Sequence, residues 1–251
     1  MDFSFKSYKL LLNSILKSER KIIPQKEFKA SLDNIVLLRH DVDRNPINAL
    51  KMAETEHDSG IKATYYFRIV NESFNPEIIV KIADLGHEIG YHYEDLSLSN
   101  GDYGRAIELF EKNLKKIREY YPVESMCMHG SPMSKYDNRD LWKKYDYKKY
   151  GIKFEPYFDM DFNKMFYITD AGRSWNNEKV SVRDKVKSCF NINIYSTENI
   201  INLLNTDDSP EQIMISTHPH NWAKNNLEWL KIFLWQSFKN TAKRILIISK
   251  K

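Results

Sequence analysis

Short runs of consecutive aliphatic residues, typical of buried strands, alternate along this chain with segments in which apolar residues recur at helical spacing. Phe5, Tyr8, Leu12 and Ile15 follow the helical period, so the chain is predicted to open with an amphipathic helix. The first strand follows in the stretch IVLLRHDVDRNP, residues 35–46. There four aliphatic residues run directly into arginine, histidine and two aspartates, which indicates that a buried strand reaches the surface at this point.

The alternation of strand and helix continues through the rest of the chain. Strands are predicted at residues 61–69, 87–93, 123–130, 152–160, 164–171, 186–195 and 211–218, and helices at 45–60, 75–86, 103–122, 198–205 and 226–245. Between Tyr136 and Asn177 the pattern is irregular. This order favours an α/β fold, a distorted (β/α) barrel of seven or eight strands. We expect one domain over residues 1–251, with residues 1–33 as an N-terminal helical extension.

Composition narrows the class of protein. The chain is 42% hydrophobic with only 8 Gly and 8 Pro, which is typical of an ordered globular protein. The formal net charge is +4, but the lysines are spread out, so no nucleic-acid surface is indicated. Cys127 and Cys189 form no CxxC motif. With no signal peptide and no apolar run of membrane-spanning length, we expect a cytoplasmic protein without a membrane span.

Histidines and carboxylates gather where the predicted strands end. Six of the seven histidines lie in the segments RHDVD, GHEIGYHYED, MHGSP and STHPHNW, and His57 is the exception. In α/β barrels the functional residues come from the carboxyl ends of the strands, where the βα loops begin. These segments are therefore the candidates for a functional site.

The first strand end projects two carboxylates to the same side. In an extended strand the side chains of residues i and i+2 share a face, so Asp41 and Asp43 point the same way. One such carboxylate can hold a divalent metal while the other takes a proton from the attacking water. Arg39 shares this face, so an ion pair between Arg39 and Asp41 that only stabilises the strand end is an alternative.

The segment GHEIGYHYED adds an imidazole and a carboxylate. His92 and Glu94 share one face at i and i+2, and this mixture is common around Zn²⁺. His87 lies on the opposite face of a regular strand. We expect His87 to be structural, with its ring packed or bonded to the backbone.

The order of HDVD, GHEIGYH, HGSP and THPHNW resembles the polysaccharide deacetylase (NodB-type) superfamily, especially its WbmS-like branch, from about Ile35 to Trp222. That resemblance implies a distorted barrel that hydrolyses N- or O-acyl groups of sugars with a bound divalent metal, usually zinc. It also implies a catalytic base at Asp41, metal ligands at Asp43 and His92, and a histidine that protonates the leaving group at His218. In the family the two aspartates are often adjacent.

The chain departs from this family at the second metal histidine. The family places it four residues after the first, where this chain has Leu96. Either Glu94 or His129 is expected to complete the metal shell. Loss of the ligand also fits weak metal binding or a relative that binds a glycan without hydrolysing it. The alternative for His129 is a structural role in the turn with Gly130 and Pro132.

Substrate contacts are predicted from three further segments. Asp170, Arg173 and Trp175 are candidates for a sugar-recognition wall, and the alternative is a loop anchored by a buried tryptophan. His220 and Trp222 are expected to shape the pocket, and Arg39 is included among the substrate-binding candidates. The stripe of Trp229, Phe233 and Leu234 is expected to pack against the barrel as core.

These observations predict a metal-dependent carbohydrate deacetylase, a hydrolase acting on C–N bonds other than peptide bonds. The expected substrate is an N-acetyl or N-formyl amino sugar in a polysaccharide precursor, with Trp175 and Trp222 stacked on the sugar ring. The alternative is a catalytically weakened glycan-binding relative. A metal phosphohydrolase of the HD type is disfavoured, because His40 and Asp41 follow a strand rather than lying on a helix. The sequence does not predict an oligomeric state.

Overall fold

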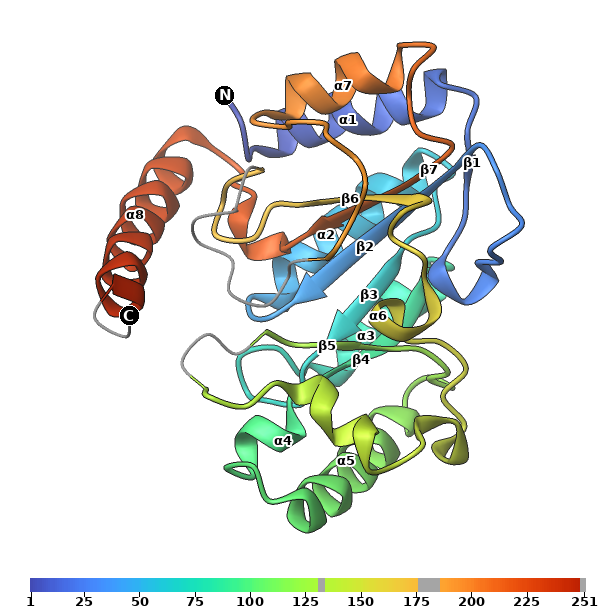
Figure 1. The fold of residues 1–251 in the computed structure, drawn as a ribbon. Helices are drawn as coiled ribbons and strands as arrows, with labels where there is room; N and C mark the ends of the chain where they lie inside the picture. Colours follow the sequence, from blue (N-terminus) through green and yellow to red (C-terminus); the bar gives the residue numbers. More distant parts are fainter. Residues whose placement is uncertain (131–133, 176–185, 249–251) are drawn as a thin grey trace.

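The computed structural model describes residues 1–130, 134–175 and 186–248, and it describes side chains as far as residue 241. A curled parallel sheet forms the centre of the molecule, with the strand order β5-β4-β3-β2-β7-β6 and β1 paired with β2 (Figure 1). The strands are β1 (Lys21–Ile22), β2 (Ile35–Val42), β3 (Thr64–Phe67), β4 (Glu88–Tyr93), β5 (Met126–Met128), β6 (Met165–Thr169) and β7 (Gln212–Thr217). The predicted α/β class is confirmed, and the seven observed strands agree with the predicted number of seven or eight, although β1 was not predicted as a strand. Across the described ranges the edge strands β5 and β6 do not pair, so the sheet is a half-barrel.

Helices surround this sheet. They are α1 (Phe5–Lys17), α2 (Pro46–Asp58), α3 (Pro76–Asp84), α4 (Asp95–Leu98), α5 (Tyr103–Arg118), α6 (Pro156–Asp159), α7 (Thr197–Leu204) and α8 (Asn226–Ile248). The first and seventh helices lie side by side although they are far apart in sequence, and Asn205 just beyond α7 donates to Ser14 Oγ of α1 at 3.3 Å (Figure 1). Helix α8 stands at one side of the molecule.

Strand β2 is the central element, because it pairs with both β3 and β7. All eight of its residues are buried, including Arg39, His40 and Asp41. A strand covered on both faces reads as a continuous apolar run, which explains the aliphatic stretch at residues 35–38. The polar residues follow at the carboxyl end of the strand. The space between Asp41, Asp43, His92, His129 and His218 at this end of the sheet is called the cleft below.

One glycine allows β4 to fit against its neighbour. A Cβ atom at Gly90 would lie 2.2 Å from the ring of Tyr66 on β3. Because this ring is buried, it could not move away without disturbing its neighbours. Glycine is therefore required within the segment GHEIGYH for close strand packing, two residues before His92.

Two predicted strands are wrong. Residues 186–195 are extended but pair with no strand of the described chain, and Phe190, Ile192 and Ile194 pack on the core from one side. One-sided packing produces the same alternation as a half-buried strand. In residues 152–160 only Phe154 forms an isolated bridge, to Ser125. Helix α6 begins at Pro156 because proline suits the first helical position and the Glu155 carboxylate caps the helix.

The expectation that the last helix packs as core is also wrong. Phe233 is 44% exposed and Leu234 is 59% exposed, and only one side of α8 contacts the body of the protein. Among the described residues no helix has the length and apolar character needed to cross a bilayer.

The buried carboxyl group of Asp95, the first residue of α4, makes the free energy of unfolding depend on pH. Asp95 is fully buried, and its carboxyl group accepts hydrogen bonds from Tyr91 Oη and from Asn113 Nδ2, each at 2.8 Å. Burial raises the pKa of Asp95 to about 7, although both hydrogen bonds act to lower it. The folded chain therefore binds this proton more tightly than the unfolded chain, in which the pKa is near 4.

Such a group contributes stability that is fully present below pH 4 and is lost as the pH rises through about 7. In the natural chain this group should lower the free energy of unfolding by roughly 2–4 kcal/mol between pH 4 and pH 7, and Asp95→Asn should remove that decrease. Urea unfolding at several pH values measures it, with the exposed Asp58→Asn as the control. Equal slopes for Asp95→Asn and the natural chain would contradict the assignment.

Candidate metal centre and active site

Four strand ends bring their polar side chains to one place. Asp41 is the last residue but one of β2, and Asp43 directly follows that strand. His92 lies on β4, His129 follows β5, and His218 follows β7. Because all these strands are parallel, their carboxyl ends meet at one edge of the sheet. The topology therefore gathers residues that are up to 177 positions apart in the sequence.

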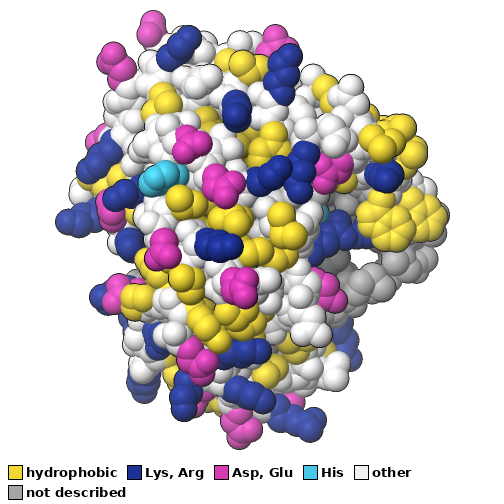
Figure 2. Space-filling view, turned by 180° about the vertical axis from the view of Figure 1, so that it is seen from behind, with side chains coloured by type: hydrophobic (Ala, Val, Ile, Leu, Met, Phe, Trp, Pro, Cys, Tyr) yellow, Lys and Arg dark blue, Asp and Glu magenta, His cyan; other side chains and the backbone are white. Residues whose placement is uncertain are grey.

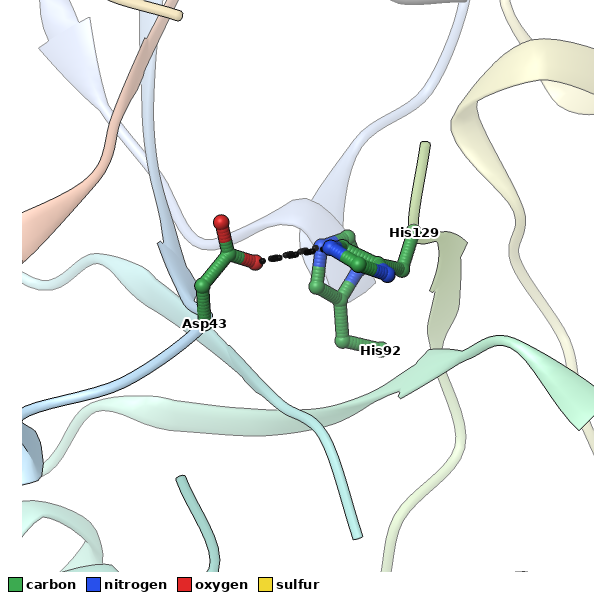
Figure 3. A group of neighbouring side chains, drawn as sticks. All are labelled: Asp43, His92 and His129. Carbon is green, nitrogen blue, oxygen red and sulfur yellow. Dashed lines mark ion pairs between the residues drawn. The ribbon is translucent and has the colours of Figure 1, made fainter. Parts of the chain in front are cut away.

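Asp43, His92 and His129 form a group whose ligand atoms all lie within 4.8 Å of one another. Asp43 Oδ1 is 3.5 Å from His92 Nε2 and 3.4 Å from His129 Nε2, and Figure 3 shows the three side chains pointing toward one another. Ligand atoms bound tetrahedrally at the usual zinc distances are about 3.3 Å apart. The spacing therefore fits a zinc ion held by one carboxylate and two imidazoles.

The two imidazoles are oriented through their other ring nitrogens. His92 Nδ1 lies 2.9 Å from the carbonyl oxygen of Cys127, to which it donates, and His129 Nδ1 lies 2.9 Å from Glu94 Oε2. A histidine that donates through Nδ1 presents the lone pair of Nε2. Both Nε2 atoms are thus arranged as ligands that face Asp43.

Glu94 lies behind His129 and outside the group of ligand atoms. Its Oε1 accepts a hydrogen bond from Arg68 Nε at 2.7 Å, and Arg68 also donates to the carbonyl oxygen of Asp43 at 3.2 Å. Burial raises the pKa of Glu94, but His129 and Arg68 outweigh it and hold the pKa below its ordinary value. The geometry gives Glu94 the role of orienting His129. Leu96, four residues after His92, is buried in the core.

The carboxylate of Asp43 has an unsatisfied atom. Its Oδ1 is buried and has no hydrogen-bond partner among the described residues. Burial raises the pKa of Asp43, but the nearby His129, His92 and His218 hold it well below its usual range, so the group is ionised. The positive charge that stabilises this carboxylate comes either from protons on the imidazoles or from a cation that their Nε2 atoms would bind in place of those protons. The residues present therefore fit a divalent metal.

Asp41 forms a two-point ion pair with Arg39. Arg39 Nε donates to Asp41 Oδ1 at 2.8 Å and Nη2 to Oδ2 at 2.6 Å. Burial raises the pKa of Asp41, but Arg39 and then His92 and His218 lower it to about 2. The ion pair of the structural alternative is thus present. The same carboxylate lies 3.9 Å from His92 Nε2, so it also faces the group around Asp43.

His218 is held by a buried carboxylate on the far side of the cleft. Its Nδ1 is 2.7 Å from Asp170 Oδ1, which also accepts from the His218 backbone amide, while Asp170 Oδ2 accepts from Trp222 Nε1 at 2.8 Å. Burial lowers the pKa of His218, but Asp170 and then Asp43 and Asp41 raise it to about 10. The imidazole therefore carries a proton, with Nε2 4.0 Å from Asp43 Oδ2.

The expected sugar-binding wall is not formed by the residues predicted for it. Five of the six candidates are buried and packed against other side chains: Arg39, Asp170, Arg173, Trp175 and Trp222. Trp222 has no exposed surface, and Trp175 is 4% exposed and stacks on Phe3 with the ring centroids 5.7 Å apart. Neither ring has a free face for a sugar. The segment of Asp170, Arg173 and Trp175 therefore fits the alternative interpretation, a loop anchored by a buried tryptophan.

His220 remains beside the site. Its ring centroid is 5.8 Å from that of His218, and its Nδ1 is buried with no partner in the described chain. Burial holds the pKa of His220 well below its ordinary value, so the ring is neutral. This side chain can donate or accept one hydrogen bond next to His218.

A buried hydrogen-bonded network behind the cleft was not predicted from the sequence. Glu56 on α2 is fully buried, and its carboxylate accepts from Tyr8 and from Tyr65 and lies 2.7 Å from His40 Nε2. His40 Nδ1 is 2.7 Å from Thr217 Oγ1. A sequence signal existed: Glu56 falls on the same helical stripe as Ala49 and Met52, where apolar residues were expected.

The structural role expected for His87 is confirmed. Its Nδ1 accepts from the Ala63 amide at 3.1 Å and its Nε2 lies 3.0 Å from the carbonyl oxygen of Ala53. Burial lowers the pKa of His87, which keeps the ring neutral in these backbone contacts.

Replacing Glu56→Gln should lower the free energy of unfolding by roughly 2–4 kcal/mol. In the natural chain Tyr8, Tyr65 and His40 share two charged carboxylate oxygens, whereas the glutamine side chain would offer them a single uncharged acceptor oxygen. Chemical denaturation measures the change. The control is Glu54→Gln, an exposed glutamate on the same helix, which should stay within about 0.5 kcal/mol of the natural chain. Equal stability of the two variants would contradict the role of the network.

No known family model matches this chain, and no curated protein matches it. Among solved structures it is similar to a CE4 family pseudoenzyme from Bacillus anthracis, with 12% identity and a TM-score of 0.48, covering 87% of this chain and 66% of that one. It is also similar to a CE4 esterase from Streptococcus mutans, with 13% identity and a TM-score of 0.47 over 86% and 82% of the two chains. A family 4 carbohydrate esterase from Streptomyces lividans, solved with acetate, aligns at 14% identity and a TM-score of 0.41 over 82% and 88%. This chain thus spans slightly less than two thirds of the Bacillus anthracis protein.

Proposed function

We propose that this chain is a metal-dependent hydrolase that removes an N-acyl group, acetyl or formyl, from an amino sugar in surface-polysaccharide biosynthesis. The observation that carries the proposal is the group of Asp43, His92 and His129, which stands between an ionised carboxylate at Asp41 and a protonated imidazole at His218. Metal-assisted hydrolysis of an acyl group requires these three parts.

Asp43, His92 and His129 would hold the metal, and Zn²⁺ suits their mixture of one oxygen and two nitrogen donors. Glu94 acts as the partner that fixes the ring of His129. When bound, a divalent cation supplies Lewis-acid polarisation of the acyl oxygen and makes water more acidic.

Asp41 and His218 move the protons. Arg39 keeps Asp41 ionised and fixed in orientation, and the ionised form is the one that accepts a proton from the attacking water. As the water oxygen bonds to the acyl carbon, the carbon–nitrogen bond breaks and His218 Nε2 protonates the departing amine. Asp170 holds His218 in the orientation that aims Nε2 at the cleft. The products are a carboxylate and a free amino sugar.

The proposal of an amino-sugar substrate in surface-polysaccharide biosynthesis is based on a sequence resemblance. The segments HDVD, GHEIGYH, HGSP and THPHNW resemble the WbmS-like branch of the NodB-type superfamily. We place the reaction in the cytoplasm on a polysaccharide precursor, within a single catalytic domain of residues 1–251. The first 33 residues contribute α1 and β1, and Tyr8 of α1 joins the network at Glu56.

A second candidate function is binding of a sugar precursor without hydrolysis. The observation in its favour is Leu96, which is buried where the family has its second metal histidine. The two candidates differ in metal content and in turnover.

We expect the purified chain to carry about one zinc ion, since three protein ligands in this arrangement give tight binding. Asp43→Ala, His92→Ala and His129→Ala should each reduce zinc content several-fold. Elemental analysis by mass spectrometry measures it, with His57→Ala as the matched control for loss of a histidine outside the cleft. Retention of the full zinc content by all three variants would refute the assignment.

Asp41→Asn and His218→Ala should retain zinc but lose turnover by a factor on the order of 10²–10⁴. The assay offers the zinc-loaded protein a panel of nucleotide-linked N-acetyl and N-formyl amino sugars and follows release of acetate or formate by mass spectrometry. Near-normal rates in either variant would contradict its role in proton transfer. Release of acid from none of the substrates by a zinc-loaded natural chain would favour the binding function.

A further inference from the structure

The proposed chemistry does not use the exposed side of α8, which carries several large apolar side chains. Its exposed apolar side chains recur at spacings of three and four residues, at Leu227, Leu230, Leu234 and Phe238, with Trp235 beside them. Their exposed fractions run from 48% to 68%. Figure 2 shows hydrophobic side chains gathered at the edge of the molecule where α8 lies, with basic side chains nearby.

The opposite side of the same helix is attached to the body. Trp229 Nε1 donates to the carbonyl oxygen of Asp2 at 2.6 Å, and Asn240 Nδ2 donates to that of Gly172 at 2.9 Å. The guanidinium of Arg173 lies over the ring of Trp229, 4.6 Å from its centroid. The helix therefore has a fixed orientation, with its apolar stripe turned away from the protein.

Charge is distributed unevenly between this segment and the rest of the chain. Residues 224–251 contain seven of the 38 lysine and arginine residues and one of the 34 aspartate and glutamate residues, a net charge of +6. Residues 1–223 consequently carry −2 of the total of +4. Exposed Lys231 lies within one turn of both Leu227 and Leu234, so positive charge borders the apolar stripe directly.

From this combination we infer that α8 docks on a membrane surface that contains anionic lipids. An apolar stripe of leucine and aromatic side chains bordered by lysine is the pattern of a helix that lies in the plane of the interface. Each lysine or arginine near an anionic bilayer adds to the binding. A second copy of the chain is a poorer occupant, since both copies would bring the same basic segment, residues 224–251, to the contact. Nucleic acid is poorer too, since three of the five exposed apolar side chains are leucines, which offer bases no stacking surface.

The test is sedimentation of the full chain with vesicles. The chain should bind vesicles of phosphatidylcholine and phosphatidylglycerol in a ratio of roughly 2 to 1, and not vesicles of phosphatidylcholine alone. Binding should fall when the salt is raised to about 0.5 M, because salt screens the attraction. Equal binding to both kinds of vesicle, or to neither, would overturn the inference.

Reversing a charge on α8 tests whether vesicle binding depends on charge at this helix or only on the net charge of the chain. Lys231→Glu should weaken binding to the anionic vesicles by about fivefold or more. The control is Lys9→Glu on α1, an exposed site with the same change of net charge, which should weaken binding less than about twofold. Equal effects of the two variants would contradict docking through α8.

Removal of the apolar stripe tests its insertion. The double variant Leu234→Ser with Phe238→Ser should lose binding by roughly tenfold or more, whereas Leu10→Ser with Leu98→Ser, exposed leucines on α1 and α4, should not. Sedimentation velocity without vesicles detects the competing occupant: a dimer that only the α8 variant abolishes would assign the stripe to contacts between copies and overturn the inference. None of these measurements depends on hydrolysis.

Discussion

The buried carboxylate of Glu56 connects the elements that the cleft depends on. It accepts hydrogen bonds from Tyr8 of α1 and Tyr65 of β3 and pairs with His40 of β2, which in turn contacts Thr217 at the end of β7. His40 precedes Asp41, and Thr217 precedes His218. The network therefore fixes the two strand ends that carry the ionised carboxylate and the protonated imidazole. Such a network stabilises only when every member is satisfied, which makes it specific for one arrangement.

Opposite charges in the cleft are balanced by pairs that lie behind the reacting groups. Arg39 faces Asp41, Arg68 faces Glu94, and Asp170 faces His218. The pairs at Asp41 and His218 orient side chains that face Asp43, and the pair at Glu94 holds the carboxylate that orients the ring of His129. Asp43 differs, because its buried oxygen has only imidazole nitrogens as neighbours. An ionised carboxylate beside two imidazoles is the physical reason that these residues fit a divalent metal.

In the proposed metal centre, His129 would be the third ligand, and its position shows how a neighbouring strand of a parallel sheet can supply a donor. The position four residues after His92 belongs to α4, and Leu96 there packs into the core. His129 comes instead from the end of β5, which is paired with β4, so its ring reaches the same space from the adjacent strand. Glu94 then serves as the hydrogen-bond partner of that ring.

The sequence by itself determined the α/β class, most strand positions and the strand ends that carry histidine and aspartate, because hydrophobic periodicity and the i, i+2 rule are local. It also separated His87 from the cleft by strand parity. Other features were decided by contacts between distant segments. The burial of Trp175 and Trp222, the extended segment at 186–195 and the exposure of α8 depend on which surface each element meets, and a pattern of spacing is the same whether an apolar face is covered or left open. The choice of His129 as the neighbour of Asp43 likewise follows from the pairing of β4 with β5, which only the folded chain establishes.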